Sequence, residues 1–179
     1  MMWRMQTRSH RLLPALAACA ALLFAGCGER EEEAEAPAQE ATPAATAAAA
    51  DISTDLKSKP AIPAPQGQPP AELQVEDVVE GDGKAAKSGA QISVQYVGAS
   101  WSTGQEFDAS WDRGGEPFVF QLGAGNVIPG WDQGLEGMKV GGRRKLVIPP
   151  DLGYGAQGSP PAIAPNETLV FVVDLLEVG

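Results

Sequence analysis

The stretch NVIPGWDQGLEGMKVGGRRKLVIPPDLGYG, residues 126–155, decides the fold. A helix is expected to begin at Pro129. Proline has no backbone N–H, and the N–H groups of the first helical turn have no partner within the helix, so proline costs nothing there. Three apolar residues then recur on one helical face at spacing i, i+4, i+7: Trp131, Leu135 and Met138. Glycines close this helix. A strand is predicted to begin near Arg143, to include Leu146 and Ile148, and to end at the two prolines that follow.

Outside this stretch, apolar residues mostly alternate with polar ones, which is the period of a half-buried strand. The predicted strand segments are 73–79, 92–96, 118–120, 146–148, which follows the helix, and 169–175. Several short strands joined by glycine-rich turns, with one short helix, are typical of an α+β domain. We therefore predict that residues 73–179 form a twisted antiparallel β-sheet wrapped around one short α-helix.

The composition changes sharply before this domain. From Gly28 to Glu72 the chain is rich in Ala, Pro, Glu, Gln and Thr, and no apolar face recurs. Such a segment buries too little apolar surface to offset its ordering entropy, and its prolines prevent a long helix. The sequence therefore predicts a disordered linker over residues 27–72.

The amino-terminal end has the pattern of a cleaved export signal. Residues 1–11 carry three arginines and no acid, and the apolar run 12–25 is too short to cross a hydrocarbon layer of about 30 Å. The string FAGC, which ends at Cys27, resembles the lipobox read by lipoprotein signal peptidase. We predict a signal peptide over residues 1–26 and lipidation of Cys27. Cleavage before Cys19, which follows a similar string, and secretion without a lipid are the alternatives.

The resulting protein is expected in the cell envelope, anchored to a membrane through its lipid. Gly28, rather than an aspartate, follows the cysteine, which resembles sorting to an outer membrane with the domain facing the periplasm. No dimerising helix precedes the domain, so a monomer is expected.

Charge and residue types exclude several functions. The chain has 13 Lys and Arg against 23 Asp and Glu, a net charge of −10, which disfavours nucleic acid as a partner. The only histidine, His10, and both cysteines precede Gly28. After lipidation, no Ser-His or Cys-His pair, zinc site of the usual ligands or disulfide is possible. We expect no metal and no cofactor.

Three strings carry a resemblance to a known family: residues 95–123 (QYVGASWSTGQEFDASWDRGGEPFVFQLG), 126–155 and 164–178 (APNETLVFVVDLLEV). Together they resemble the FKBP family, the peptidyl-prolyl cis-trans isomerases that bind tacrolimus and rapamycin. The resemblance extends from about Leu73 to the carboxyl terminus. It implies a half-barrel sheet, proline-containing polypeptides as substrates and macrolide inhibitors as further partners.

The resemblance also implies two groups of site residues. The catalytic group is Asp108, Tyr154, Phe107, Trp131 and Ile128. The substrate-binding group is Tyr96, Phe118, Val127, Ile163 and Phe171. Trp131 would form the pocket floor, the Ile128 N–H and the Tyr154 hydroxyl would hold substrate carbonyls, and Asp108 would lie beside the twisting bond. Two rim positions depart from the best-known members, Ser159 in place of an imidazole and a small Ala162.

The function expected from these features is isomerisation of X-Pro bonds in exported proteins, by an apolar aromatic pocket without covalent catalysis. Two alternatives belong to other classes. One is a binding or scaffold module that keeps the fold but not the turnover, and the other is a general periplasmic chaperone.

Overall fold

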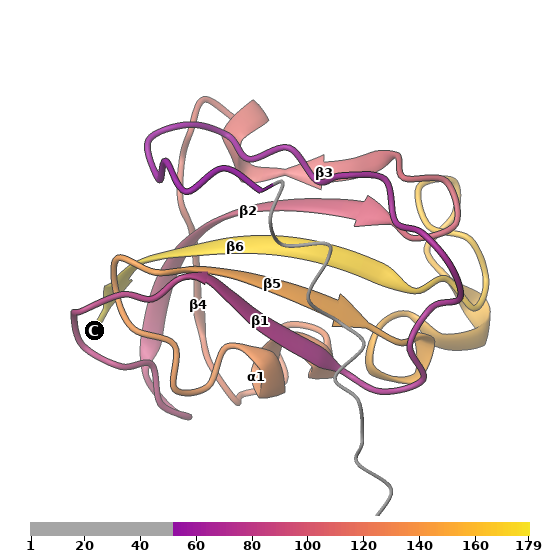
Figure 1. The fold of residues 1–179 in the computed structure, drawn as a ribbon. Helices are drawn as coiled ribbons and strands as arrows, with labels where there is room; N and C mark the ends of the chain where they lie inside the picture. The colour runs from indigo at the N-terminus through magenta and orange to yellow at the C-terminus, as the bar shows by residue number, and fades with distance from the viewer. Residues whose placement is uncertain (1–51) are drawn as a thin grey trace, which may run out of the picture. The chain divides into compact units, whose positions relative to one another are not determined.

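The computed structural model describes residues 52–179, in which six antiparallel strands form one sheet (Figure 1). The strands are β1 (Gln74–Val79), β2 (Gln91–Ser100), β3 (Glu106–Ala109), β4 (Phe118–Gln121), β5 (Arg143–Ile148) and β6 (Leu169–Val178). Their order is β1-β5-β6-β2-β3, and β4 also pairs with β2. The helix α1 spans Pro129–Gly134, and three short 3₁₀ turns are η1 (Ser110–Asp112), η2 (Pro150–Leu152) and η3 (Gly155–Gln157). The predicted sheet and helix are confirmed, whereas the predicted signal peptide lies outside the described residues.

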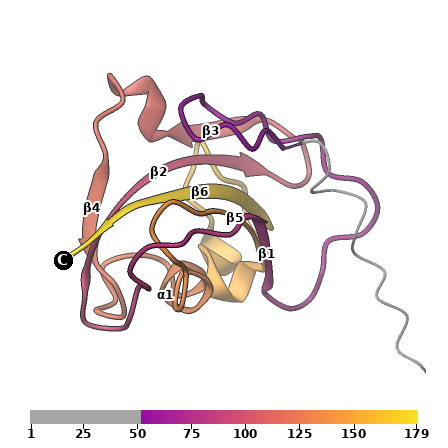
Figure 2. The same ribbon diagram turned by 60° about the vertical axis from the view of Figure 1, so that its left-hand side comes forward.

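The sheet curves around α1, which packs on its concave face (Figure 2). Glycines allow this helix to approach β5 closely. A Cβ on Gly130 would lie 2.5 Å from Cγ2 of Ile148, and one on Gly134 would lie 2.7 Å from Cδ2 of Leu146. Real Cβ atoms essentially never come that near, so a larger residue would push the helix away from the sheet. The buried core between helix and sheet contains one face of β2, β5 and β6 together with Trp131.

The helix is shorter than its apolar spacing indicated. It ends at Gly134, with Leu135 as its C-cap, and Met138 lies beyond it, after Gly137 in the left-handed region at φ 75°. Trp131, Leu135 and Met138 are nevertheless all buried. The prediction that they share a helical face is therefore wrong for Met138, which reaches the core from the turn after the helix.

The two long strands position the rest of the sheet. In the β2–β6 pair, Tyr96 lies opposite Val173 and Gly98 lies opposite Phe171. The strand β3, which pairs with the end of β2, was not predicted, because only four residues contribute and they do not alternate. Within residues 52–179 the structure has no helix with the length and apolar character needed to cross a membrane.

The sheet is also covered on the face opposite α1. The alternation of β2, β5 and β6 places a second set of buried apolar residues there, separate from the core around the helix: Val97, Ala99, Val147, Val170 and Val172. Residues 52–72, which we call the strap, run along this side (Figures 1 and 2). The strap contributes the buried residues Ile52 and Pro60.

The strap corrects the predicted linker. Residues 52–72 fall within the segment expected to be disordered, yet they make hydrogen bonds and ion pairs with the sheet. The physical reason is that their partners are far away in sequence, on β5 and β3, and the strap itself shows no periodicity. The remainder of the predicted linker, residues 27–51, lies outside the described residues.

Candidate functional site

Six aromatic side chains from four strands and the helix meet on the concave face of the sheet. We call them the aromatic cluster: Tyr96 of β2, Phe107 of β3, Phe118 and Phe120 of β4, Trp131 of α1 and Phe171 of β6. Five of these six were predicted as site residues from the resemblance. Phe120 was not, because its place two residues after Phe118 indicated only the same strand face.

Trp131 lies at the centre of the cluster. Its ring centroid is 5.1 Å from that of Tyr96 and 5.2 Å from that of Phe171, with interplanar angles of 81° and 87°. Such edge-to-face contacts are a preferred arrangement of aromatic pairs. These three rings are buried, whereas Phe118 is 37% exposed at the margin. The centre of the cluster is therefore shielded from water, and Phe118 is partly exposed at its margin.

A glycine in β2 makes room for two of the rings. A Cβ on Gly98 would lie 2.6 Å from Cε1 of Phe171 and 2.9 Å from Cζ of Phe107. The two phenylalanine rings are themselves in edge-to-face contact, with centroids 5.6 Å apart. The absence of a side chain at Gly98 thus allows both rings to lie against the strand.

A charged network borders the aromatic cluster. The Tyr96 hydroxyl donates to Oδ2 of Asp108 at 2.5 Å, and Arg113 donates to Oδ1 of Asp108 at 2.6 Å and to the Tyr96 oxygen at 2.7 Å. The guanidinium carbon of Arg113 also lies 5.4 Å from the centroid of the Tyr96 ring. Burial, together with the Asp108 carboxylate, raises the pKa of the Tyr96 hydroxyl. Arg113 was not predicted as a site residue, because its one signal in the sequence is an opposite charge five residues after Asp108.

Buried polar groups hold the segment that carries Asp108 and Arg113. Ser110, at the start of η1, is fully buried, and its Oγ accepts a hydrogen bond from the Tyr96 N–H at 2.8 Å and donates to Oε1 of Gln95. The Gln95 side chain in turn donates to the Gly115 carbonyl at 2.5 Å. Because buried polar groups without partners are costly, this chain of bonds fixes η1 against β2.

Three predicted apolar residues lie next to the cluster. Ile163 is buried in the same core, and Val127 and Ile128 are partly buried against it. Ile128 is the N-cap residue of α1, and its carbonyl accepts the Trp131 N–H at 2.9 Å. Its own N–H donates none of the hydrogen bonds found among residues 52–179. This donor therefore remains available beside Trp131.

Tyr154 is less tightly placed than the other predicted residues. It is 41% exposed, and its ring takes part in none of the aromatic pairs within residues 52–179. It precedes η3, in a loop whose far side is tied by the reciprocal backbone bonds of Ser159 and Ile163 at 2.9 and 3.0 Å. Ser159 and Ala162 are both exposed, as expected of rim positions.

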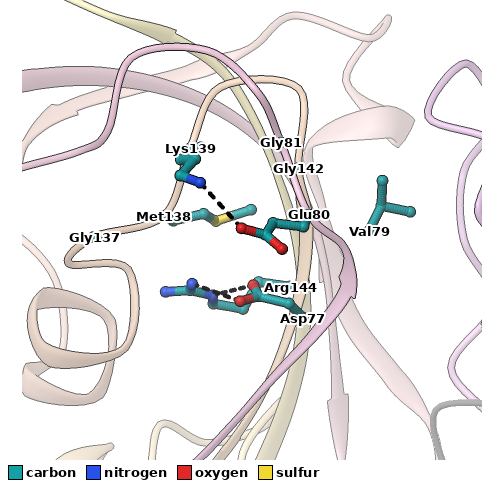
Figure 3. A pocket seen from close by; sticks show the side chains of 9 residues that line it. All are labelled: Asp77, Val79, Glu80, Gly81, Gly137, Met138, Lys139, Gly142 and Arg144. Atoms are coloured by element: carbon teal, nitrogen blue, oxygen red, sulfur yellow. Dashed lines mark hydrogen bonds and ion pairs between the residues drawn. The ribbon is translucent and has the colours of Figure 1, made fainter.

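Two hollows elsewhere in the described part of the chain are not lined by the predicted residues. The first has a volume of about 40 Å³ and lies between β1 and the loop after α1 (Figure 3). It is flanked by the ion pairs Arg144–Asp77 and Lys139–Glu80 and has room for only a few water molecules. The second, of about 340 Å³, lies between the strap and Trp101. The first is lined by no aromatic ring and the second by one, Trp101, so neither gathers several rings as the aromatic cluster does.

Comparisons with known proteins agree with this geometry. Residues 82–176 match the model of the family described as FKBP-type peptidyl-prolyl cis-trans isomerase. An "FK506-binding protein" of Streptomyces anulatus is 59% identical over 121 residues, which cover 67% of this chain and 97% of that protein. A "Probable FK506-binding protein" of Corynebacterium glutamicum is 45% identical over 118 residues, or 66% of this chain and 97% of that protein.

Solved structures show the same fold. The crystal structure of AtFKBP13 matches with a TM-score of 0.57 and 37% identity, over 62% of this chain and 96% of that one. The crystal structure of FkpA from Escherichia coli matches with a TM-score of 0.54 and 48% identity, over 59% of this chain and 47% of that one. The fold, the aromatic cluster and the matched residues lead to one conclusion: the chain belongs to the FKBP-type peptidyl-prolyl cis-trans isomerase family and is a peptidyl-prolyl cis-trans isomerase.

Proposed function

We propose that the aromatic cluster is the catalytic site and that X-Pro bonds rotate against Trp131, beside the carboxylate of Asp108. The observation that carries this proposal is the position of a buried Trp131 among aromatic rings, one of which, Tyr96, is hydrogen-bonded to Asp108. The substrate is a proline-containing segment of an unfolded or partly folded polypeptide. Its proline ring lies on the indole.

The chemistry requires an apolar surface and no nucleophile. Rotation about a peptide bond breaks amide resonance and has a barrier of about 18–20 kcal/mol. The twisted amide has lost its zwitterionic resonance form and is less dipolar than the planar amide. A water-poor aromatic site therefore favours the twisted state over the planar one, which is selective stabilisation of the transition state.

Polar groups orient the substrate. The N–H of Ile128, which donates no hydrogen bond within residues 52–179, and the exposed hydroxyl of Tyr154 are the donors we assign to substrate carbonyls. Arg113 and Tyr96 contact both oxygens of Asp108, which fixes the carboxylate beside the ring of the bound proline. The indole N–H of Trp131 is buried without an acceptor among residues 52–179.

Macrolide inhibitors are a second class of ligand for the same cluster. The names of the bacterial relatives specify binding of FK506, which is tacrolimus. Ser159 and Ala162 are small and exposed, so the rim above the cluster is open on that side. We expect this opening to weaken macrolide binding more than turnover of short peptides, because these two residues supply neither the floor nor a carbonyl donor.

The proposed setting is the cell envelope. A lipid on Cys27 would anchor the chain to a membrane, with the domain facing the periplasm and acting as a monomer on exported proteins. The lipobox-like string FAGC and the short apolar run before it support this proposal.

The function is tested by measuring exchange of proline peptides by NMR for the parent protein and for Asp108→Val. Loss of a hydrogen-bonded charge at the site is expected to lower kcat/KM by about tenfold or more, with the far-UV circular dichroism unchanged. Asp82→Asn, an exposed carboxylate outside the aromatic cluster, is the matched control and retains the parental rate. An Asp108→Val protein with parental kcat/KM would show that the site is misassigned.

A further inference from the structure

The strap is fastened to the sheet by a buried arginine. Arg143 in β5 is fully buried and makes a two-point ion pair with Asp174 of β6, at 2.5 and 2.6 Å. Its remaining donors reach two carbonyls of the strap, those of Ser53 at 2.5 Å and Ser58 at 3.1 Å. A buried guanidinium needs acceptors for its donors, and four hydrogen bonds serve its five N–H groups here, two of them to carbonyls of the strap. The backbone at Ser58 is thereby fixed relative to the sheet.

Lys59, which follows Ser58, extends from this fixed backbone to the edge of the candidate site. The Lys59 ammonium lies 2.7 Å from Oε1 of Glu106 in β3 and 2.8 Å from both carboxylate oxygens of Asp112 in η1. One cation therefore joins the strap to the start of β3 and to the end of η1, 47 and 53 residues later in the chain. The shared contact raises the pKa of Lys59, chiefly through Asp112, and lowers that of Asp112.

The residues between these two carboxylates are the ones that matter for the proposed site. The segment from Glu106 to Asp112 includes Phe107 and Asp108, and Arg113 follows directly. On its sheet side this segment is held by the buried Ser110, and Lys59 holds its outer side at both ends. Farther along the chain, the strap also stays close to the turn between β2 and β3. A Cβ on Gly104, in that turn, would lie 3.4 Å from the Cβ of Ala64 in the strap.

We propose that Lys59 is a positioning residue for catalysis: through its ion pairs, the strap fixes the positions of Phe107 and Asp108. This inference rests on the proposed function, since it assigns a purpose to the geometry of Asp108. Lys59 touches no substrate. It acts through Glu106 and Asp112, which hold the two ends of the segment that carries the carboxylate.

The exposure of the three groups determines the kind of effect to expect. The side chains of Lys59, Glu106 and Asp112 are 33%, 38% and 60% exposed, so water screens the ion pairs and their contribution to global stability is small. A shift of a catalytic group by a fraction of an ångström nevertheless changes the rate, because catalysis depends on alignment. Loss of Lys59 should therefore affect kcat/KM more than the unfolding transition.

The experiment compares Lys59→Met, Lys59→Arg and Lys57→Met in the full chain. Lys57 is an exposed lysine of the strap with no side-chain hydrogen bond within residues 52–179, so Lys57→Met removes the same charge without the contact. Lys59→Met is expected to lower kcat/KM about two- to fivefold at low salt, the range of a partly exposed ion-pair network. Lys59→Arg restores most of the rate, and Lys57→Met leaves it at the parental value.

Two further measurements separate positioning from a general loss of structure. Adding Lys59→Met to a protein that already carries Glu106→Gln and Asp112→Asn should cause no further loss of kcat/KM, because the partners are gone. The amide NMR shifts of Phe107 and Asp108 should move in Lys59→Met and stay unchanged in Lys57→Met, whether or not the protein turns over peptides. Equal rates and equal shifts in the two Met variants would overturn the positioning role.

These readouts distinguish this inference from the proposed function. If Asp108→Val keeps the parental rate while the shifts in β3 respond to Lys59→Met, the assigned site is wrong and the strap contact is real. If Asp108→Val loses activity while Lys59→Met changes neither rate nor shifts, the site is correct and Lys59 has no positioning role.

Discussion

At the scale of single residues, the site depends on the space that Gly98 leaves and on the contacts that Tyr96 makes. Gly98 leaves space that two phenylalanine rings occupy, so both rings lie close to β2. Tyr96 has two roles, because its ring packs on Trp131 while its hydroxyl joins the network of Asp108 and Arg113. The apolar and the charged parts of the site thus meet at one side chain.

The role of Gly98 gives a direct prediction. Gly98→Ala places a Cβ within 3 Å of both Phe107 and Phe171, so the rings must move. We expect the free energy of unfolding to fall by about 1–3 kcal/mol, as for other overpacked sites, and kcat/KM to fall about tenfold or more. Ser93→Ala, in the same strand, is the control for denaturant unfolding and peptide exchange. Parental activity in Gly98→Ala would mean that these two rings do not contribute to the site.

The buried hydroxyl of Tyr96 gives a prediction on pH. Burial and Asp108 raise the pKa of Tyr96 in the folded state above its ordinary value of about 10. Between the two pKa values the native protein keeps a proton that the unfolded chain has lost. The free energy of unfolding therefore falls as the pH rises through this range.

The titration can be isolated because the chain has only two tyrosines. In Tyr154→Phe the phenolate absorbance reports Tyr96 alone, and its midpoint should lie above that of the same protein in denaturant. Asp108→Asn in this background removes a charge that opposes ionisation and should lower the midpoint. A native midpoint equal to the denatured one would contradict the buried hydrogen-bonded state of the hydroxyl.

At the scale of elements, every strand of the sheet except β3 could be predicted from the sequence, and the strap could not. The alternation in β2 and β6 indicates which residues face the core, and Tyr96 and Phe171 lie there as expected. The strap has no such period. Its two buried residues, Ile52 and Pro60, and its carbonyls have partners only once β5 and β6 have formed, so its order is a tertiary effect.

The residues of the candidate site also divide into those that could be predicted from the sequence and those that could not. Five of the six aromatic residues could be identified because they fall at family positions, three of them in strands that the pattern predicts: Tyr96, Phe118 and Phe171. Arg113 of the charged network could not be identified, because it follows a four-residue strand and a 3₁₀ turn that no periodicity indicates. The same holds for Lys59, whose partners lie 47 and 53 residues away. Local pattern indicates which side chains are buried, whereas these ion pairs depend on tertiary placement.

At the scale of the whole molecule, the catalytic domain and the proposed anchor must be connected. The first described residue, Ile52, follows Cys27 by 25 positions. A fully extended chain of that length spans at most about 90 Å, which limits how far an anchored domain could act from a membrane. The strap begins at Ile52, so the connection joins the sheet on the face opposite α1 and the aromatic cluster.

The anchor itself is the last prediction. Lipidation needs the thiol of Cys27, so Cys27→Ser should abolish incorporation of a labelled fatty acid and move the protein from the membrane to the soluble fraction or leave it as precursor. Cys19→Ser, the matched control within the same apolar run, should keep both label and membrane fractionation. Label that persists in Cys27→Ser but disappears in Cys19→Ser would assign cleavage to the earlier string. If neither substitution changes fractionation, the chain is not a lipoprotein, and the isomerase activity of its domain, which needs no lipid, would be unaffected.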